Sequence, residues 1–165
     1  MILVTVGTER FPFDRLVRTV DQAASQLNGE SIFVQLGHST YLPMRCQWTR
    51  FLAYQALIEQ LQQARVVVSH AGAGMLVLCA RLGKVPIVIP RRRRFGEHVD
   101  DHQMGLATRM ARSGFAVLAE PLEELVPLLR KDGQWHTQMD GLHASSPGLA
   151  KALGAYLNEI AAERA

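Results

Sequence analysis

The chain has 165 residues, of which 48% are hydrophobic and 20% charged, and its formal net charge is +3. This length and composition are typical of one soluble globular domain, and the small positive charge suits an anionic ligand without predicting a nucleic-acid partner. The two cysteines, Cys46 and Cys79, exclude a disulfide framework and indicate the reducing cytoplasm. No apolar run approaches the roughly 18 residues of a membrane span, and residues 1–4 predict a strand rather than a signal peptide.

Strands and helices alternate from the start of the chain. The predicted elements up to residue 63 are a strand at 2–6, a helix at 14–27, a strand at 31–36, a short strand within 48–52 and a helix at 54–63. We expect Asp14 to cap the first helix and Asn28 with Gly29 to end it. Residues 38–49 lack any periodicity and contain Pro43, so they predict a loop.

The most informative pattern follows these elements. A strand at 66–69, a glycine turn at 70–74, a helix at 75–82 and a strand at 85–89 predict a βαβ unit. Glycines in that turn let the backbone approach an anion, and the free N–H groups at the helix start then face it. The spacing is Gly-x-Gly without a third glycine. On spacing alone, a tight turn that binds no ligand therefore remains the alternative.

The last part of the chain predicts further strands and helices. A polar loop at 90–101 comes first, and then a helix that Asp100 or Asp101 caps and that ends at Arg112. A strand at 115–118 and a helix at 121–129 follow. An irregular connection at 132–146 then leads to a final helix at 147–163. An apolar stripe marks the final helix, formed by Leu149, Leu153, Tyr156, Leu157 and Ile160. This stripe either packs on the sheet or docks a partner.

Strands that alternate with helices predict a parallel sheet covered on both faces, in a single Rossmann-like, doubly wound α/β domain. We assign residues 1–165 to this one domain, with its core at 1–131 and the connection and final helix at 132–165. Right-handed crossovers place the loops that follow the strands at one edge, where such folds bind ligands. In a strand order 3-2-1-4-5-6, Gly7 and Gly72 would face each other across the ligand crevice.

Four segments carry a family resemblance. They are VTVGT, SHAGAG, GKVPIVIPR and GEHVDDHQ, and they resemble, in order and at about the same spacing, the carboxyl-terminal domain of glycosyltransferase family 28. The likeness covers about residues 1–120. It is strongest to free-standing versions of this domain, the donor-binding subunits of two-component transferases, as in dolichol-linked N-acetylglucosaminyltransferase and bacterial exopolysaccharide glycosyltransferases.

The resemblance implies the carboxyl-terminal half of a GT-B glycosyltransferase, which binds a UDP-sugar as its substrate. The residues implied in donor diphosphate binding are Gly7, Thr8, His70, Gly72, Ala73 and Gly74, and those implied in sugar binding are Asp101, His102 and Gln103. Helix N–H groups and an imidazole can stabilise the charge that develops on the leaving diphosphate. We therefore expect neither a metal nor another cofactor, and the sequence holds no Asp-x-Asp pair.

A partner is also implied by the resemblance. In such systems a separate membrane-anchored subunit holds a lipid-linked saccharide acceptor, in polysaccharide or glycan biosynthesis. This chain would then work at the inner face of the membrane through its partner. The sequence offers no convincing general base, so we expect that group on the partner.

Two positions depart from the family pattern. Leu78 stands where related sequences usually carry a glutamate that binds ribose, and Met75 where they favour serine or threonine. Leu78 favours a second hypothesis, a non-catalytic module that binds a nucleotide-sugar or a partner. A dinucleotide oxidoreductase is a weaker alternative, because the third glycine and the expected acidic residue are missing.

Four adjacent arginines, Arg91, Arg92, Arg93 and Arg94, follow the strand at 85–89. Such a run is usually a solvated loop, but next to a donor site it predicts contacts with an acidic sugar such as glucuronate, with lipid phosphates or with a partner. The remaining histidines, His38, His136 and His143, show no metal-ligand spacing and are expected at the surface.

Overall fold

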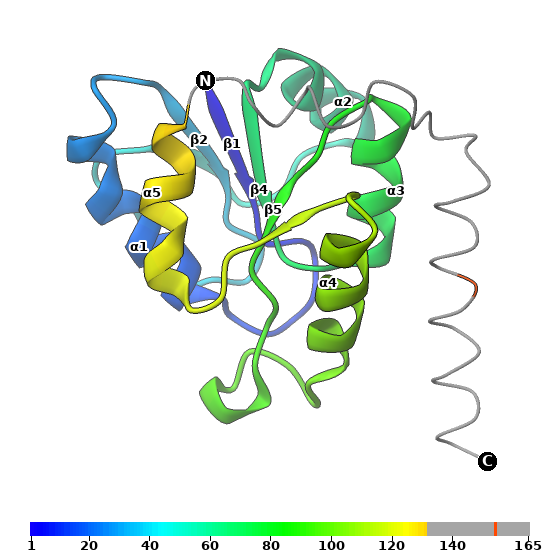
Figure 1. Ribbon diagram of the computed structural model, residues 1–165. Helices are drawn as coiled ribbons and strands as arrows, with labels where there is room; N and C mark the ends of the chain where they lie inside the picture. Colours follow the sequence, from blue (N-terminus) through cyan, green and yellow to red (C-terminus); the bar gives the residue numbers. More distant parts are fainter. Residues whose placement is uncertain (132–153, 155–165) are drawn as a thin grey trace.

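Six parallel strands in the order β3-β2-β1-β4-β5-β6 form one sheet in the computed structural model, which describes residues 1–131 and Gly154 (Figure 1). The strands are β1 (Ile2–Thr5), β2 (Ile32–Gln35), β3 (Gln47–Thr49), β4 (Val66–Ser69), β5 (Ile87–Val88) and β6 (Val117–Leu118). The helices are α1 (Asp14–Ala23), α2 (Tyr54–Gln63), α3 (Ala73–Arg81), α4 (His102–Arg112) and α5 (Leu125–Arg130), with short 3₁₀ helices at Ala24–Gln26, Arg93–Phe95 and Leu122–Glu124. The strand order is the 3-2-1-4-5-6 order considered above for a ligand crevice between Gly7 and Gly72.

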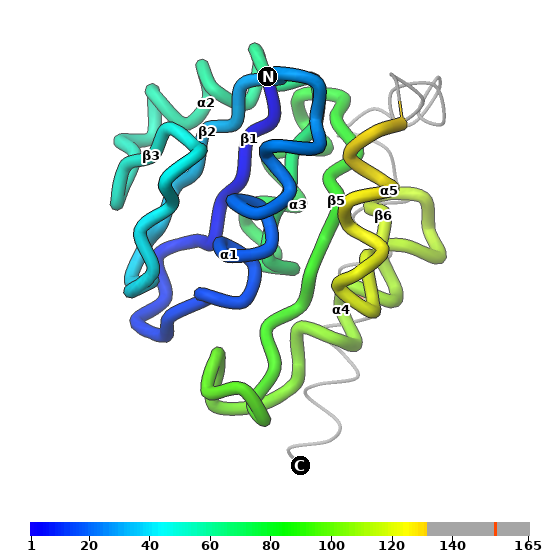
Figure 2. Tube along the Cα trace, turned by 90° about the vertical axis from the view of Figure 1, so that its left-hand side faces the viewer, coloured from blue at the N-terminus to red at the C-terminus, as the bar shows by residue number. Residues whose placement is uncertain are grey.

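Helices cover both faces of the sheet. α1 and α5 lie on one face, in front of the strands in Figure 2, and α2, α3 and α4 lie on the other (Figure 1). Side chains of β1 alternate between these layers, because successive residues of a strand point to opposite faces. Ile2 and Val4 belong to the core under α1 and α5, whereas Leu3 packs with Leu61 and Cys79 of α2 and α3. This arrangement confirms the doubly wound α/β fold.

Local details differ from the sequence prediction at the ends of helices. The first helix ends earlier than predicted and continues as the 3₁₀ turn, and Asn28 and Gly29 then take positive φ values of 52° and 76°. Asp14 does not cap this helix. Its carboxylate accepts the backbone N–H groups of Thr40 and Tyr41, at 2.7 and 3.1 Å, and so attaches the loop after β2 to α1.

Two further predictions concern the ends of the chain and its cysteines. The final helix and its apolar stripe at 147–163 lie outside the described residues. Cys79 is buried and Cys46 partly buried, and both are free thiols. No helix in the described part of the chain is both long and apolar enough to cross a membrane.

A buried arginine connects the loops at the carboxyl edge of the sheet. Arg91 follows β5 and is fully buried. Its guanidinium donates to the backbone carbonyls of Val6 (2.7 Å), Phe11 (2.9 Å), Pro12 (3.3 Å) and Glu97 (3.0 Å), and it lies 4.8 Å from the ring centroid of Phe13. Burial lowers the pKa of Arg91 to about 10, so the group still carries its charge at neutral pH. The loop between β1 and α1 is thereby joined to the loop between β5 and α4.

Glu97 strengthens the same connection. Its carboxylate accepts two hydrogen bonds from the guanidinium of Arg15 on α1, at 2.8 and 2.9 Å, and one from the backbone N–H of Arg92 at 2.9 Å. Paired bonds between arginine and a carboxylate are among the strongest in proteins. The loop between β5 and α4 is therefore joined to the segment after β1 by two side chains, Arg91 and Glu97.

We predict that Arg91→Lys lowers the free energy of unfolding by about 2–4 kcal/mol, because an ammonium group cannot reach all four carbonyls and leaves buried acceptors without a donor. The exposed Arg94 lies in the same loop, and Arg94→Lys should change stability by less than about 0.5 kcal/mol. Denaturant unfolding of the three proteins measures both values. Equal unfolding midpoints for the parent and Arg91→Lys would contradict this assignment.

Candidate functional site

The imidazole of His70 lies between two glycines at the carboxyl ends of β1 and β4. These strands are neighbours in register, with Thr5 opposite Ser69, so Gly7 and His70 come together just beyond them. A Cβ atom at Gly7 would lie 2.4 Å from Cε1 of His70, and one at Gly72 would lie 2.3 Å from Nε2. Neither glycine can carry a side chain unless the ring moves. Gly7 and Gly72 face each other as predicted, with the imidazole between them.

His70 is neutral at physiological pH. Only 9% of the residue is exposed, and this burial, assisted by the positive charge of Arg91, lowers its pKa to about 4. Its Nδ1 atom is buried and has no hydrogen-bond partner among the described residues. A buried polar atom without a partner is unusual in proteins and often marks a functional site.

A pocket of about 390 Å³ opens beside the histidine. Its walls come from the ends of β1, β2 and β4 and from α2 and α3, and its lining residues are Thr5, Gly7, Thr8, Glu9, Gln35, Tyr54, Leu57, His70, Gly72, Gly74, Met75 and Leu78. At the carboxyl ends of β1 and β2, the hydroxyl of Thr5 donates to Oε1 of Gln35 at 2.7 Å. The pocket therefore combines a polar pair with apolar walls from α2 and α3.

Sequence reasoning found part of this pocket and missed the rest. Five of the predicted diphosphate-binding residues line it, namely Gly7, Thr8, His70, Gly72 and Gly74. The lining residues Gln35 and Tyr54 were not predicted. The position of Gln35 at the carboxyl end of a strand next to β1 was a usable signal, because ligands bind at that edge.

The first turn of α3 faces this pocket with backbone donors. Gly72 precedes the helix, and its carbonyl accepts the N–H groups of Met75 and Leu76, each at 3.1 Å. The N–H groups of Ala73 and Gly74 lie earlier in the turn, where no intrahelical carbonyl is available to them. Both residues are exposed. A helix start of this kind attracts anions through its N–H groups and its dipole.

The predicted sugar-binding residues are not part of the lining of this pocket. They begin α4, on the segment that extends beyond the carboxyl edge of the sheet at the bottom of Figure 1. Gln103 is buried, and its Oε1 accepts the backbone N–H of Arg91 at 3.2 Å. Asp101 accepts the N–H of Arg93 at 2.9 Å and makes no capping bond to α4. Asp101 and His102 are both exposed, so these two are accessible to a ligand, whereas Gln103 is not.

The four arginines do not form one anion-binding group. Arg91 is fully buried, and Arg92 is partly buried and pairs with Glu120 at 2.7 Å. Only Arg93 and Arg94 are exposed, and the guanidinium of Arg94 lies 4.7 Å from the ring centroid of Phe95. Of the four arginines, only Arg93 and Arg94 are therefore accessible for the expected contacts with an acidic sugar or a phosphate.

Leu78 also lines the pocket. Its side chain offers no hydrogen-bonding atom, so this position supplies the pocket with an apolar contact in place of the carboxylate that the family pattern predicts.

Comparisons with known sequences agree with this geometry. The family model described as glycosyltransferase family 28 C-terminal domain matches residues 1–139. The UDP-N-acetylglucosamine transferase subunit ALG13 of Mus musculus is 32% identical over an alignment of 121 residues, and the match covers 67% of this chain and 10% of the mouse protein. The Homo sapiens protein of the same name is 30% identical over an alignment of 123 residues, and the match covers 68% of this chain and 10% of the human protein. The matched region thus spans about a tenth of these relatives.

Solved structures share the fold at low sequence identity. The calicheamicin glycosyltransferase CalG4 matches 97% of this chain with a TM-score of 0.61 and 18% identity, over 44% of its own length. The glycosyltransferase SsfS6 of Streptomyces sp. SF2575, complexed with thymidine diphosphate, matches 91% with a TM-score of 0.60 and 19% identity, over 37% of its length. MurG of Acinetobacter baumannii matches 92% with a TM-score of 0.55 and 21% identity, over 44% of its length. The fold is that of one half of a GT-B glycosyltransferase, and the match over residues 1–139 shows that the chain belongs to the glycosyltransferase family 28 C-terminal domain family.

Proposed function

We propose that this chain is the UDP-sugar-binding catalytic subunit of a membrane-associated glycosyltransferase that acts on a lipid-linked saccharide. The observation that carries the proposal is the buried His70 imidazole between Gly7 and Gly72, beside the open first turn of α3. The names of the mouse and human relatives support it, since both are subunits of a transferase that uses UDP-N-acetylglucosamine.

The proposed chemistry places the donor diphosphate against α3. As the glycosidic bond breaks, negative charge develops on the leaving diphosphate, and the N–H groups of Ala73 and Gly74 stabilise it without reorganising. The neutral ring of His70 adds one N–H donor and one acceptor nitrogen. Fixed donors of this kind replace a divalent ion, so the proposed transfer is metal-independent.

The proposed enzyme needs a second component. In a GT-B transferase the reaction takes place between two halves, and this chain matches 37–44% of the length of the three solved transferases described above. The other half, on a membrane-anchored partner, would bind the acceptor and supply the general base. The chain would then act at the cytoplasmic face of the membrane through that partner.

A second candidate function follows from Leu78. With a leucine in place of a ribose-binding carboxylate, the chain would be a non-catalytic module that binds a nucleotide-sugar or a partner. Only the catalytic subunit would transfer sugar, whereas a nucleotide-sugar could bind in both cases.

Substitution at Gly74 tests the position of the diphosphate. A Cβ atom at Gly74 would meet no other heavy atom within 4 Å, so Gly74→Val should fold normally while its side chain blocks the approach to α3. We predict that UDP binds this variant at least about tenfold more weakly, a loss of about 1.4 kcal/mol, in isothermal titration calorimetry. Arg81→Ala, at the exposed far end of the same helix, is the control and should bind UDP normally. Unchanged affinity in Gly74→Val would place the diphosphate elsewhere.

Protonation of His70 offers a second test. Burial lowers its pKa to about 4 in the free protein, whereas a bound diphosphate places negative charge near the ring and favours the imidazolium form. We predict that saturating UDP raises the pKa of His70, as measured by NMR titration of its imidazole resonances. The exposed His38 provides the internal control. A pKa of His70 that is the same with and without UDP would refute the contact.

Sugar transfer distinguishes the two candidate functions. We predict that these 165 residues bind UDP-N-acetylglucosamine but transfer no sugar to a lipid-linked acceptor, because they match only one half of a GT-B transferase. Membranes from the source organism should restore transfer, measured with radiolabelled donor. Transfer by the isolated chain would contradict the proposed partner, and donor binding without transfer in either preparation would favour the non-catalytic module.

A further inference from the structure

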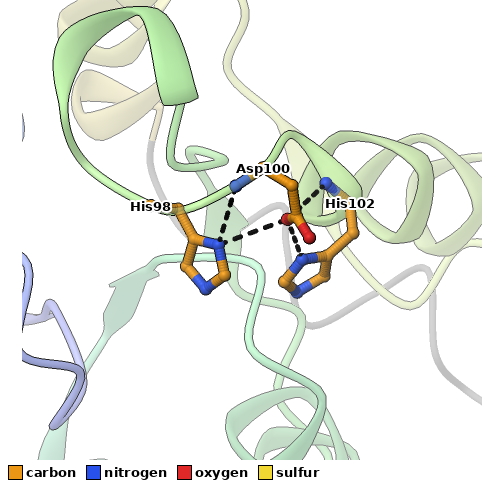
Figure 3. A group of neighbouring side chains, drawn as sticks. All are labelled: His98, Asp100 and His102. Carbon is orange, nitrogen blue, oxygen red and sulfur yellow. Dashed lines mark hydrogen bonds and ion pairs between the residues drawn. The ribbon is translucent and has the colours of Figure 1, made fainter.

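Three potential metal ligands converge at the start of α4. His98 and Asp100 belong to the loop before this helix, and His102 is its first residue (Figure 3). Nδ1 of His98 lies 3.2 Å from Oδ1 of Asp100, and the same oxygen contacts Nδ1 of His102. All three ligand atoms lie within 4.8 Å of one another. The three side chains thus face one point from alternate positions of a His-x-Asp-x-His segment.

The separation of His98 and Asp100 matches that of two ligands on a single metal ion, whereas His102 lies closer to Asp100 and must move away from it to bind the same ion. A divalent ion bound to imidazole nitrogen and carboxylate oxygen at about 2.0–2.1 Å holds neighbouring ligand atoms roughly 2.8–3.4 Å apart, the shorter values in octahedral and the longer in tetrahedral geometry. The 3.2 Å between His98 and Asp100 falls in this interval. A proton can bridge only one pair of these atoms at a time, whereas a metal ion accepts a lone pair from all three.

The ligand types select a class of metal. Two imidazoles and one carboxylate favour Zn²⁺, Co²⁺, Ni²⁺ or Fe²⁺ over Mg²⁺ and Ca²⁺, which prefer oxygen ligands. Three protein ligands leave coordination positions for water or another molecule. The side chains of Asp100 and His102 are 42% and 38% exposed, so an ion can reach the site, and the side chain of His98 is only 11% exposed and is held in place by its surroundings.

We propose that His98, Asp100 and His102 bind one divalent transition-metal ion, and that this ion withdraws His102 from the donor sugar. The second half of this proposal rests on the proposed function, in which His102 contacts the sugar. The site is distinct from the diphosphate contacts at α3, where the proposed transfer uses no metal. The bound ion therefore acts as an inhibitor of donor binding.

Metal titration without nucleotide tests the site by itself. We expect Zn²⁺ to bind the full chain in isothermal titration calorimetry, and Co²⁺ to shift the ¹⁵N resonances of the His98 and His102 imidazoles. His98→Ala and Asp100→Asn should each weaken Zn²⁺ binding at least about tenfold, because each removes a ligand. His38→Ala, which removes an exposed histidine elsewhere, should leave the affinity unchanged. Equal Zn²⁺ affinity in the parent and in His98→Ala would overturn the site and leave Asp100 as a partner of the two imidazoles and of the backbone N–H of His102, at 3.2 Å.

Donor titrations then test the coupling. Saturating Zn²⁺ should lower the affinity of the parent for UDP-N-acetylglucosamine several-fold and leave its affinity for UDP unchanged. In His98→Ala, Zn²⁺ should change neither affinity, although the nucleotides chelate Zn²⁺ to the same extent as they do with the parent. An equal effect of Zn²⁺ on UDP and on UDP-N-acetylglucosamine would overturn the coupling. Because the first titration contains no nucleotide, failure of the proposed function would not affect its result.

Discussion

The buried guanidinium of Arg91 is the interaction on which the carboxyl edge of the sheet depends. A buried charge costs several kcal/mol unless it is hydrogen-bonded, and here backbone carbonyls from two separate loops accept hydrogen bonds from both terminal nitrogens of the guanidinium, while Nε has no partner among the described residues. The backbone N–H of the same residue donates to Oε1 of Gln103, and the charge of its guanidinium contributes to the low pKa of His70. The pocket beside His70 and the start of α4 are therefore parts of one connected structure.

The sequence predicted the features that local patterns encode. Val66–Ser69 and Tyr54–Gln63 are the predicted strand and helix, because apolar periodicity and a glycine turn determine them within a few residues. The pairing of Gly7 with Gly72 followed from sheet topology alone. These predictions succeed because a doubly wound sheet brings the ends of its central strands together, whatever the other residues are.

Predictions that depended on distant contacts were less successful. Asp14 was expected to cap the first helix, but it is the first residue of α1 and its carboxylate binds Thr40, 26 positions away in the sequence. The run of four arginines suggests one exposed surface, yet Arg91 is buried because carbonyls distant in sequence accept its hydrogen bonds. His98 was not singled out, because the spacing His-x-Asp-x-His brings three ligands together only in the bent loop before α4. In each case a tertiary contact decides the role of the residue.

The central claim is that a nucleoside diphosphate binds at the first turn of α3, against His70. Backbone amide chemical shifts of the ¹⁵N-labelled chain during a UDP titration test it most directly. The largest shifts should fall on Ala73, Gly74 and Met75 and on the His70 imidazole. A saturable response confined to the exposed Arg93 and Arg94, with the amides of α3 unchanged, would contradict this account.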